Sequence, residues 1–257
     1  MAQGRTLTYF ISDLHIGAGY IGDTHDHERR LVAWLDSIAP TAKAIYLLGD
    51  VLDYWYEYRT VVPRGYVRFF GALARLADSG VEIIWLKGNH DIWIFDYLPR
   101  EIGLTVHDGI LQCDIDGRRF VMEHGDGVGE LRRSYRMLRK VFRCRFAQWL
   151  YAAIHPRWTV GFAHRWSRHS RLHGSPEPVE QLTSDDPLVK FAVGYEASHG
   201  PVDYFVFGHR HVTADYTLPS GARLFILGDG FRLMTYGVFD GLTFSLRSME
   251  TGEHSVV

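Results

Sequence analysis

A buried strand that ends in Gly49-Asp50 constrains the fold of this chain more than any other feature. The apolar run over residues 44–48 stops abruptly at this pair, which is typical of a strand inside an α/β sheet. Gly49 allows the backbone to turn sharply. The sequence therefore predicts a carboxylate fixed at a strand tip, where Asp50 could bridge two cations with one oxygen for each.

Four further polar motifs follow the ends of predicted strands. Asp13 and His15 have a spacing of two, so an extended backbone points both side chains the same way. An Asp oxygen and a His nitrogen on one face suit a borderline metal ion. We expect all of these strand tips to meet at one site. The other three motifs are Gly88-Asn89-His90-Asp91, His124-Gly125-Asp126 and Gly208-His209-Arg210-His211.

The order of the predicted elements favours an α/β layered fold. The N-terminal half alternates between strands and helices, and the tail over residues 213–249 consists of short strands that we expect to be antiparallel. His25 and His27, at the start of the first helix, are expected to be solvated. The predicted strands cover residues 7–12, 44–48, 81–86, 110–115, 118–122, 202–207, 223–227, 234–239 and 243–247, and the predicted helices cover 25–37, 63–78 and a short turn around Trp93, Phe95 and Leu98.

Composition predicts one domain over residues 1–257, with a helical insertion over residues 127–199. At 46% hydrophobic residues the chain can bury a full core. Its two cysteines provide no disulfide framework. The first residues lack the layout of a signal peptide, and no apolar run is long enough to span a membrane. We therefore expect a cytoplasmic protein.

The predicted insertion differs in charge from the rest of the chain. Residues 131–176 contain 11 Lys or Arg and no Asp or Glu, whereas the remainder has 17 basic and 30 acidic residues, a net of −13. Helical spacing predicts a basic face with an apolar face opposite it. The basic face comprises Arg132, Arg136, Arg139 and Arg143, and the apolar face comprises Leu138, Val141, Phe142 and Trp149.

Seven residues from the strand-tip motifs are candidate metal ligands. Four imidazoles, two carboxylates and one amide oxygen suit two Mn²⁺ or Fe ions better than Mg²⁺, with Zn²⁺ also possible. Two such cations would clamp a phosphate and lower the pKa of a bridging water, so that hydroxide could attack phosphorus near neutral pH. The candidates are Asp13, His15, Asp50, Asn89, His124, His209 and His211.

The ordered motifs resemble those of the calcineurin-like metallophosphoesterase superfamily. The resemblance spans residues 13–211 and implies a β-sandwich flanked by helices, in α/β/β/α layers, with a helical cap. It further implies two metal sites that share Asp50. One would use Asp13, His15, Asp50 and His211, and the other would use Asp50, Asn89, His124 and His209.

Within the superfamily, the chain is similar to the diphosphatases that split UDP-2,3-diacylglucosamine in lipid A biosynthesis. The similarity rests on Ile11-Ser-Asp-Leu-His15, on Leu52-Asp-Tyr-Trp55 and on the basic insertion. It implies release of UMP and 2,3-diacylglucosamine 1-phosphate. The substrate candidates by this likeness are Tyr135, Arg168, Ser170 and Arg171, and Asn89 and His90 of the strand-tip motif are further candidates.

His90 departs from the pattern of that diphosphatase family, whose well-known members have Arg after the Asn of this motif. His is the commoner residue in the superfamily as a whole. His90 could protonate the leaving group, since its ordinary pKa lies in the required range. The catalytic candidates are therefore His90, Asp50 and Asn89, with a structural histidine bonded to Asp53 or Asp91 as the alternative.

The basic insertion predicts a particular kind of partner. A cap over a diacylated UDP-sugar needs arginines for the phosphates and an apolar cleft for the chains. The same helix could rest on an anionic inner membrane, where each cation contributes about 1 kcal/mol. We expect no nucleic-acid partner. Two alternatives remain, namely a superfamily enzyme acting on nucleotides or phosphodiesters, including a nuclease, and a non-catalytic scaffold.

Overall fold

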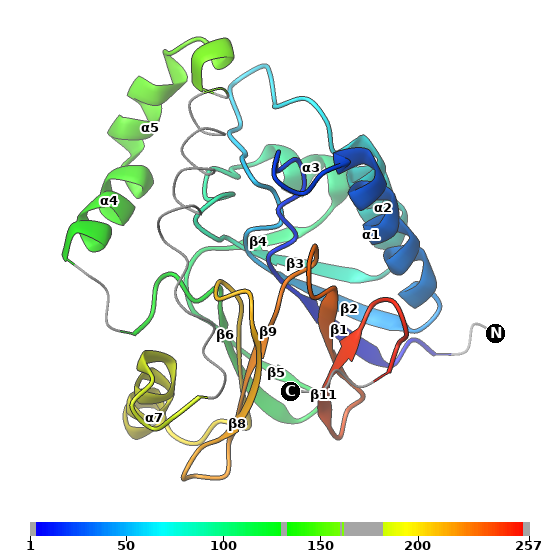
Figure 1. Cartoon of the computed structure of the whole chain (residues 1–257), viewed down its shortest axis with the longest axis vertical. Helices are drawn as coiled ribbons and strands as arrows, with labels where there is room; N and C mark the ends of the chain where they lie inside the picture. Colours follow the sequence, from blue (N-terminus) through cyan, green and yellow to red (C-terminus); the bar gives the residue numbers. More distant parts are fainter. Residues whose placement is uncertain (1–3, 130–132, 160, 162–181, 254–257) are drawn as a thin grey trace.

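Two β-sheets pack face to face and carry helices on their outer faces (Figure 1). The computed structural model describes residues 4–129, 133–159, 161 and 182–253. The first sheet has the order β11 (Phe244–Ser248), β10 (Thr235–Phe239), β1 (Leu7–Ile11), β2 (Ala42–Leu48), β3 (Glu82–Leu86) and β4 (Thr105–His107). The second has the order β5 (Leu111–Ile115), β6 (Arg118–Glu123), β7 (Tyr204–Phe207), β9 (Arg223–Leu227) and β8 (Thr213–Thr217).

Side-chain alternation along each strand divides the core into layers. On β1, Phe10 points between the sheets and stacks on Phe120 of the second sheet at 5.6 Å between ring centroids. Its neighbours Tyr9 and Ile11 point the other way, toward the helices. Those helices are α1 (Thr24–Ile38), α2 (Val67–Asp78) and α3 (Tyr97–Ile102).

The outer face of the second sheet is covered by α7 (Pro187–His199). Leu188, Val189 and Ala192 of this helix pack against Phe205 and Phe207 of β7. The result is the α/β/β/α layering expected from the sequence. Although α7 lies within the predicted insertion, it belongs to the packed body of the molecule.

Parallel pairing brings the strand tips together. In the first sheet β1, β2 and β3 are parallel neighbours, and in the second sheet β6, β7 and β9 are parallel neighbours. Because parallel strands end at the same edge of a sheet, the residues that follow them lie close together. Asp13, Asp50 and Asn89 follow the first set, and His124 and His209 follow β6 and β7.

The cap helices α4 (Arg133–Arg143) and α5 (Arg145–Ala152) stand beside the body (Figure 1). Neither helix has a fully buried residue, so polar and aromatic contacts hold them. The Tyr56 hydroxyl donates to the Gln148 carbonyl at 2.6 Å, and Trp93 Nε1 donates to the Phe142 carbonyl at 2.9 Å. Tyr56 and Trp93 therefore anchor the cap helices to the body.

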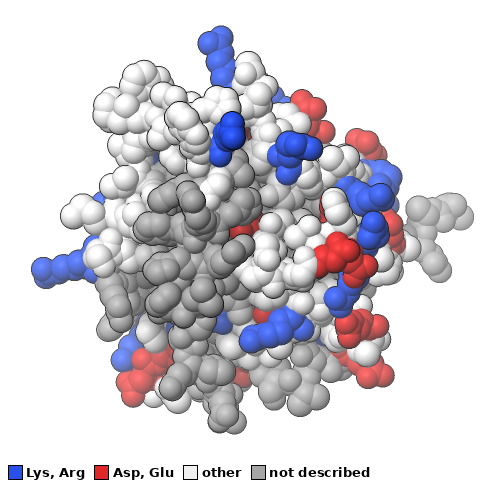
Figure 2. All heavy atoms as spheres, turned by 45° about the horizontal axis from the view of Figure 1, so that its top comes forward, with Lys and Arg blue, Asp and Glu red and all other residues white. Residues whose placement is uncertain are grey.

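Acidic side chains are unevenly spread over the face shown in Figure 2. Most acidic side chains seen in Figure 2 lie toward its right and lower edges, whereas α4 and α5 lie on the left of the molecule (Figure 1). The basic face predicted for the first cap helix is nevertheless wrong in orientation. Arg139 and Arg143 turn inward, on the same side as Phe142, because carboxylates of the body bind them. Arg132 lies outside the described residues.

Several other expectations differ from the structure. Helix α2 begins at Val67 instead of Pro63, since Tyr66 before it has the left-handed φ of 64°, and Val67 itself is exposed. Helix α3 begins only at Tyr97, after Trp93 and Phe95. The strands of residues 213–249 pair antiparallel as expected, β8 with β9 and β10 with β11, and β9 is in addition parallel to β7, which precedes this tail. The two helix starts were placed too early because a turn precedes α2 and because Trp93 and Phe95 pack as aromatic side chains without being helical.

Candidate metal centre

Three groups of described side chains could each hold a metal ion, and two of them contain only residues expected as ligands from the sequence. The third, His15, Asp53 and His90, shares His15 with the first. In the first, Asp13 Oδ1 lies 3.7 Å from His15 Nε2 and 3.6 Å from His211 Nε2. In the second, His124 Nε2 lies 3.3 Å from both Asp50 Oδ2 and His209 Nδ1. Ligand atoms within each group all lie within 4.8 Å of one another, which is the spacing expected around one cation.

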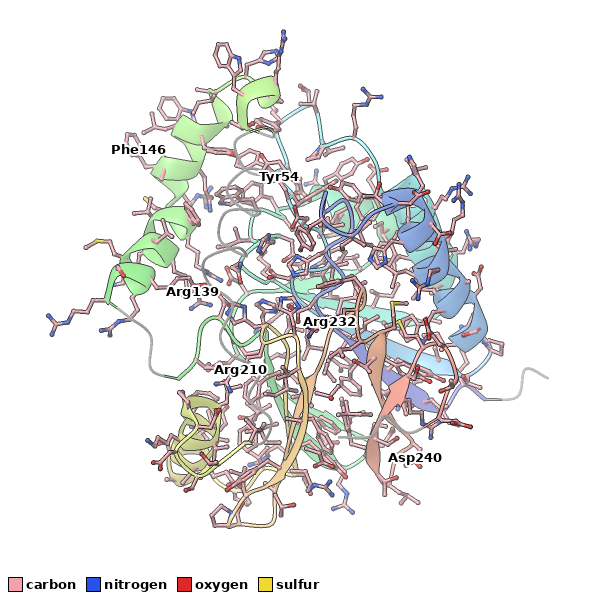
Figure 3. The ribbon with its side chains drawn as sticks, in the orientation of Figure 1. Tyr54, Arg139, Phe146, Arg210, Arg232 and Asp240 are labelled. Atoms are coloured by element: carbon pink, nitrogen blue, oxygen red, sulfur yellow. The ribbon has the colours of Figure 1, made fainter. Side chains whose placement is uncertain are left out.

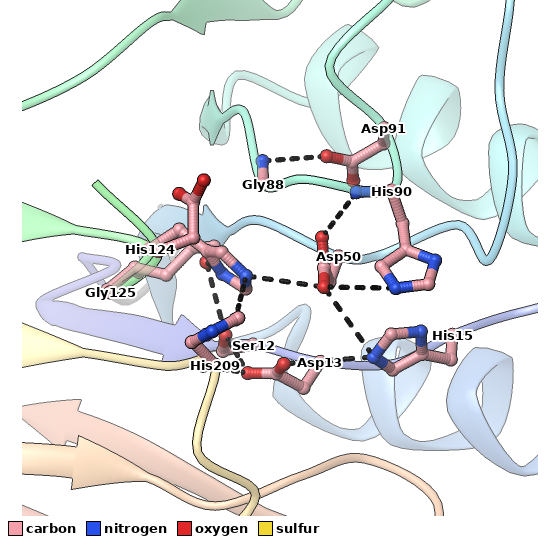
Figure 4. Close-up of polar contacts among 12 residues, drawn as sticks. Ser12, Asp13, His15, Asp50, Gly88, His90, Asp91, His124, Gly125 and His209 are labelled. Carbon is pink, nitrogen blue, oxygen red and sulfur yellow. Dashed lines mark hydrogen bonds and ion pairs between the residues drawn. The ribbon is translucent and has the colours of Figure 1, made fainter. Parts of the chain in front are cut away.

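Asp50 links the two groups (Figure 4). Its Oδ2 lies 3.3 Å from His124 Nε2 and 3.8 Å from His15 Nε2. Its Oδ1 accepts the backbone N–H of His90 at 2.8 Å. One oxygen thus binds the neighbouring loop and the other faces both groups, and the use of one oxygen for each cation stays a prediction.

Several candidate ligands have a strained, left-handed backbone conformation. Eight non-glycine residues among those described have a left-handed φ, and five of them are candidate ligands. Such conformations cost free energy and persist where the surrounding structure enforces them, commonly at functional sites. These five are Asp13, His15, Asp50, His209 and His211.

Two glycines allow the backbone to approach the candidate ligands closely. A Cβ at Gly88 would overlap the carboxylate of Asp50, and a Cβ at Gly208 would overlap the side chains of Ser12 and Asp13. Both motifs therefore need glycine for close backbone approach. The sequence shows that each glycine precedes a candidate ligand, but it does not indicate which side chains the glycines contact.

Asn89 supports the presence of a cation. Its Oδ1 is buried and accepts no hydrogen bond from any described residue. Leaving a buried amide oxygen unsatisfied costs about 1–3 kcal/mol, unless an ion takes it as a ligand. The donor set of imidazoles, carboxylates and this oxygen fits a pair of divalent transition-metal ions.

Carboxylates and imidazoles of the site shift one another's pKa. Burial alone would raise the pKa of Asp50, but the imidazoles of His124 and His90 hold it well below its ordinary value. Burial alone would lower the pKa of His124, but Asp50 and Asp13 raise it well above its ordinary value. The carboxylates thus remain ionised in a dry pocket and require positive charge beside them.

Hydrogen bonds to backbone carbonyls set the orientation of two imidazoles. His124 Nδ1 lies 2.8 Å from the Leu48 carbonyl, and His90 Nδ1 lies 2.8 Å from the Asp53 carbonyl. A carbonyl can only accept, so each Nδ1 carries the proton and each Nε2 is directed to the site. His90 Nε2 lies 3.9 Å from Asp50 Oδ2. Asp53 Oδ1 lies 3.5 Å from His15 Nδ1, so Asp53 buttresses a candidate ligand.

Two supporting residues were not assigned from the sequence. Asp91 accepts the N–H groups of Val51, Gly88 and Trp85 Nε1, and burial raises its pKa to about 6. His27 was expected to be solvated, but it is buried, with Nε2 at 2.9 Å from the Leu14 carbonyl. The apolar side of α1 carries His27 inward, so that expectation is wrong.

The loop after β6 ties the site to the cap. Glu123 and Asp126 are buried on either side of His124 and bind Arg139 of α4 at 3.2 and 3.0 Å. The Tyr135 hydroxyl donates to Asp126 at 3.1 Å, which places this substrate candidate beside the site. The remaining substrate candidates Arg168, Ser170 and Arg171 lie outside the described residues.

The chain is similar to known phosphoesterases and hydrolases. Residues 8–213 match the family model of calcineurin-like phosphoesterases. The chain is 44% identical to the UDP-2,3-diacylglucosamine hydrolase of Porphyromonas gingivalis, over 97% of this chain and 100% of that one. It is 29% identical to the hydrolase of the same name from Nitrosococcus oceani, over 86% of each chain.

Among solved structures, YfcE, a phosphoesterase from E. coli, matches with a TM-score of 0.45 and 17% identity, covering 97% of each chain. A novel archaeal phosphodiesterase matches with a TM-score of 0.47 and 13% identity, covering 93% of this chain and 98% of the other. Within the described part of the chain, no helix is both long and apolar enough to cross a bilayer.

Proposed function

This chain belongs to the calcineurin-like phosphoesterase family, and from that premise we propose that it hydrolyses the pyrophosphate of UDP-2,3-diacylglucosamine. The products would be UMP and 2,3-diacylglucosamine 1-phosphate. The observation that carries the proposal is the 44% identity to a UDP-2,3-diacylglucosamine hydrolase over nearly the whole of both chains.

The proposed ligands divide into two sets that share Asp50. Asp13, His15 and His211 would complete one site, and Asn89, His124 and His209 would complete the other. When bound, the metal pair supplies an activated water and neutralises the charge of the phosphates. We favour Mn²⁺ over Mg²⁺ because four of the proposed ligands are imidazoles. Metal analysis of protein purified without chelator tests this choice. Protein that contains Mg²⁺ and no Mn²⁺ would contradict it.

His90 is the proposed proton donor. Its Nδ1–H is held by the Asp53 carbonyl at 2.8 Å, so Nε2 is the atom that faces the reacting phosphate. The imidazolium would give its Nε2 proton to the leaving phosphate oxygen. The amide of Asn89 would orient a phosphate oxygen in the same pocket.

We further propose that residues 127–199 include a cap that faces a membrane. Seven large apolar side chains between residues 137 and 158 are exposed, and residues 131–176 contain 11 Lys or Arg and no acidic residue. A hollow of about 410 Å³ beside α4 suits a lipid phosphate. The hollow is lined by Gly127, Arg136, Arg139, Lys140, Arg143 and Cys144. Peripheral binding to the anionic cytoplasmic side of an inner membrane follows from this proposal.

An assay of product release tests the proposed function. Purified protein with Mn²⁺ should release UMP from UDP-2,3-diacylglucosamine, and Asp50→Ala should abolish that release. Asp36→Ala, which changes an exposed ion pair with Arg75, is the matched control and should retain activity. Turnover confined to a panel of nucleotides, phosphodiesters and single-stranded DNA would overturn the substrate assignment and leave the hydrolytic chemistry standing.

A further inference from the structure

A diphosphate that joins a nucleoside to a lipid must extend from the metal centre in two directions. The cap contacts one side of the centre, where Arg139 and Tyr135 bind Asp126 next to His124. The acyl half of the substrate therefore belongs on that side. The other side, at His15 and His211, carries a different group of side chains, which comprises Tyr20, Phe231 and Arg232.

Two aromatic rings border the His15 and His211 side. The Phe231 ring lies 5.9 Å from the His15 ring and 5.6 Å from the His211 ring, measured between centroids. The Tyr20 ring lies 6.0 Å from that of Phe231, at 69°. Both rings are partly exposed. They come from different loops, so the pair forms a small aromatic surface at the rim of the centre.

A cation completes this surface. Arg232 Nη2 donates to the His211 carbonyl at 2.7 Å, and its Nε lies 3.6 Å from the buried carboxylate of Asp229. Its side chain is 63% exposed, so the guanidinium is held at its base and open to solvent. Figure 3 shows Arg232 well separated from Arg139, which reaches in from the cap helix.

We propose that Tyr20, Phe231 and Arg232 form the subsite for the nucleoside monophosphate half of the substrate. A planar base stacks on aromatic side chains with about 1–3 kcal/mol per base. An adjacent guanidinium suits a phosphate or ribose oxygen. This inference rests on the proposed function, because the pyrophosphate supplies the nucleotide half that the subsite receives.

Stacking recognises the flat face of a base and reads few of its edges. The subsite should therefore bind UMP and CMP within a few-fold of each other and should bind ribose 5-phosphate at least about 10-fold more weakly. The phosphate and the sugar are common to all three ligands. The difference between UMP and ribose 5-phosphate isolates the contribution of the base.

Calorimetric titration of the Mn²⁺-loaded protein with UMP and with ribose 5-phosphate tests the proposal. Phe231→Leu keeps an apolar side chain but removes the ring face, and it should reduce the preference for UMP to less than about 3-fold. Phe231→Trp should keep the preference. Phe95→Ala, which removes an exposed ring on another surface, should leave UMP binding unchanged.

The outcomes separate this proposal from the proposed function. Equal affinity of the wild-type protein for UMP and ribose 5-phosphate would overturn the subsite, as would a UMP preference that survives in folded, metal-loaded Phe231→Leu. Failure to hydrolyse UDP-2,3-diacylglucosamine while the UMP preference is present and depends on Phe231 would overturn the lipid assignment alone. The melting temperature and metal content of each variant establish that it is folded and loaded.

Discussion

At the scale of single residues, Arg139 connects the cap helices to the metal centre. It is the cation beside two buried carboxylates, Glu123 and Asp126, which lie on either side of His124 in the chain. Burial and the charge of Asp126 raise the pKa of Glu123, so these carboxylates depend on a neighbouring cation. A buried charge left without its partner is strongly destabilising.

We predict that Arg139→Ala lowers the free energy of unfolding by roughly 3 kcal/mol, the lower end of the range for a buried pair. The lower end applies because the guanidinium is still 22% exposed. Urea denaturation measures the change. Arg136→Ala, an exposed position on the same helix, should change it by less than about 0.5 kcal/mol. Equal effects of the two substitutions would contradict the assigned role.

At the scale of elements, Glu57 determines where α3 begins. Its Oε2 accepts the backbone N–H groups of Phe95, Asp96 and Tyr97, and its Oε1 accepts that of Leu98. The first N–H groups of a helix have no partner within the helix. A side chain from a distant loop satisfies them here, and α3 therefore starts after Phe95.

Removal of this acceptor should be costly. We predict that Glu57→Ala lowers the free energy of unfolding by about 2–4 kcal/mol, since three partly buried N–H groups and the buried N–H of Leu98 lose their acceptor. Glu57→Gln keeps one oxygen and should lose less. Glu101→Ala, at an exposed position near the other end of α3, serves as control in the same denaturation series. A Glu57→Ala variant as stable as the control would show that water satisfies these donors.

The thiol pKa values of the two cysteines are shifted in opposite directions by the elements in which they lie. The backbone N–H groups of Ala147 and Phe146 at the start of α5 lower the pKa of the Cys144 thiol. Burial raises the pKa of the Cys113 thiol on β5. A lower pKa gives a larger thiolate fraction at any pH below it, and the thiolate is the nucleophile.

We therefore predict that iodoacetamide modifies Cys144 before Cys113 at pH 7.5, with a ratio that narrows as the pH rises. Peptide mapping by mass spectrometry after partial labelling measures the ratio. Denatured protein, in which both thiols are equally accessible, is the control. Faster labelling of Cys113 in the folded protein would mean that α5 does not hold Cys144 as described.

The strand tips could be predicted because the rule that places them is local. An apolar run that stops at Gly-Asp or Gly-Asn indicates a strand end, and parallel ends share an edge. The contacts of Glu57, His27 and Arg139 could not be predicted in this way. Each partner lies at least 13 residues away along the chain, and helical periodicity does not distinguish an arginine facing solvent from one facing a buried carboxylate.

At the scale of the whole molecule, the cap helices have two faces with different partners. The inner face binds carboxylates and aromatic side chains of the body, as Arg139 and Tyr151 do. The outer face exposes large apolar side chains between basic ones. Phe146 points away from the body in Figure 3 and is 66% exposed, as is Trp149. An apolar surface edged by cations and free of acids matches the interface of an anionic bilayer.

We predict that the Phe146→Ser, Trp149→Ser and Trp158→Ser triple variant loses binding to vesicles that contain anionic phosphatidylglycerol. Full burial of one such side chain contributes about 1.5–3 kcal/mol, so half of that at three positions implies a loss on the order of 100-fold in a sedimentation assay. The control replaces Val61, Val67 and Leu242, which are exposed and lie outside residues 131–176, by Ser. Salt should weaken wild-type binding, because the cations contribute about 1 kcal/mol each at the surface. Vesicle binding that is equal in the two triple variants would assign membrane contact to another surface.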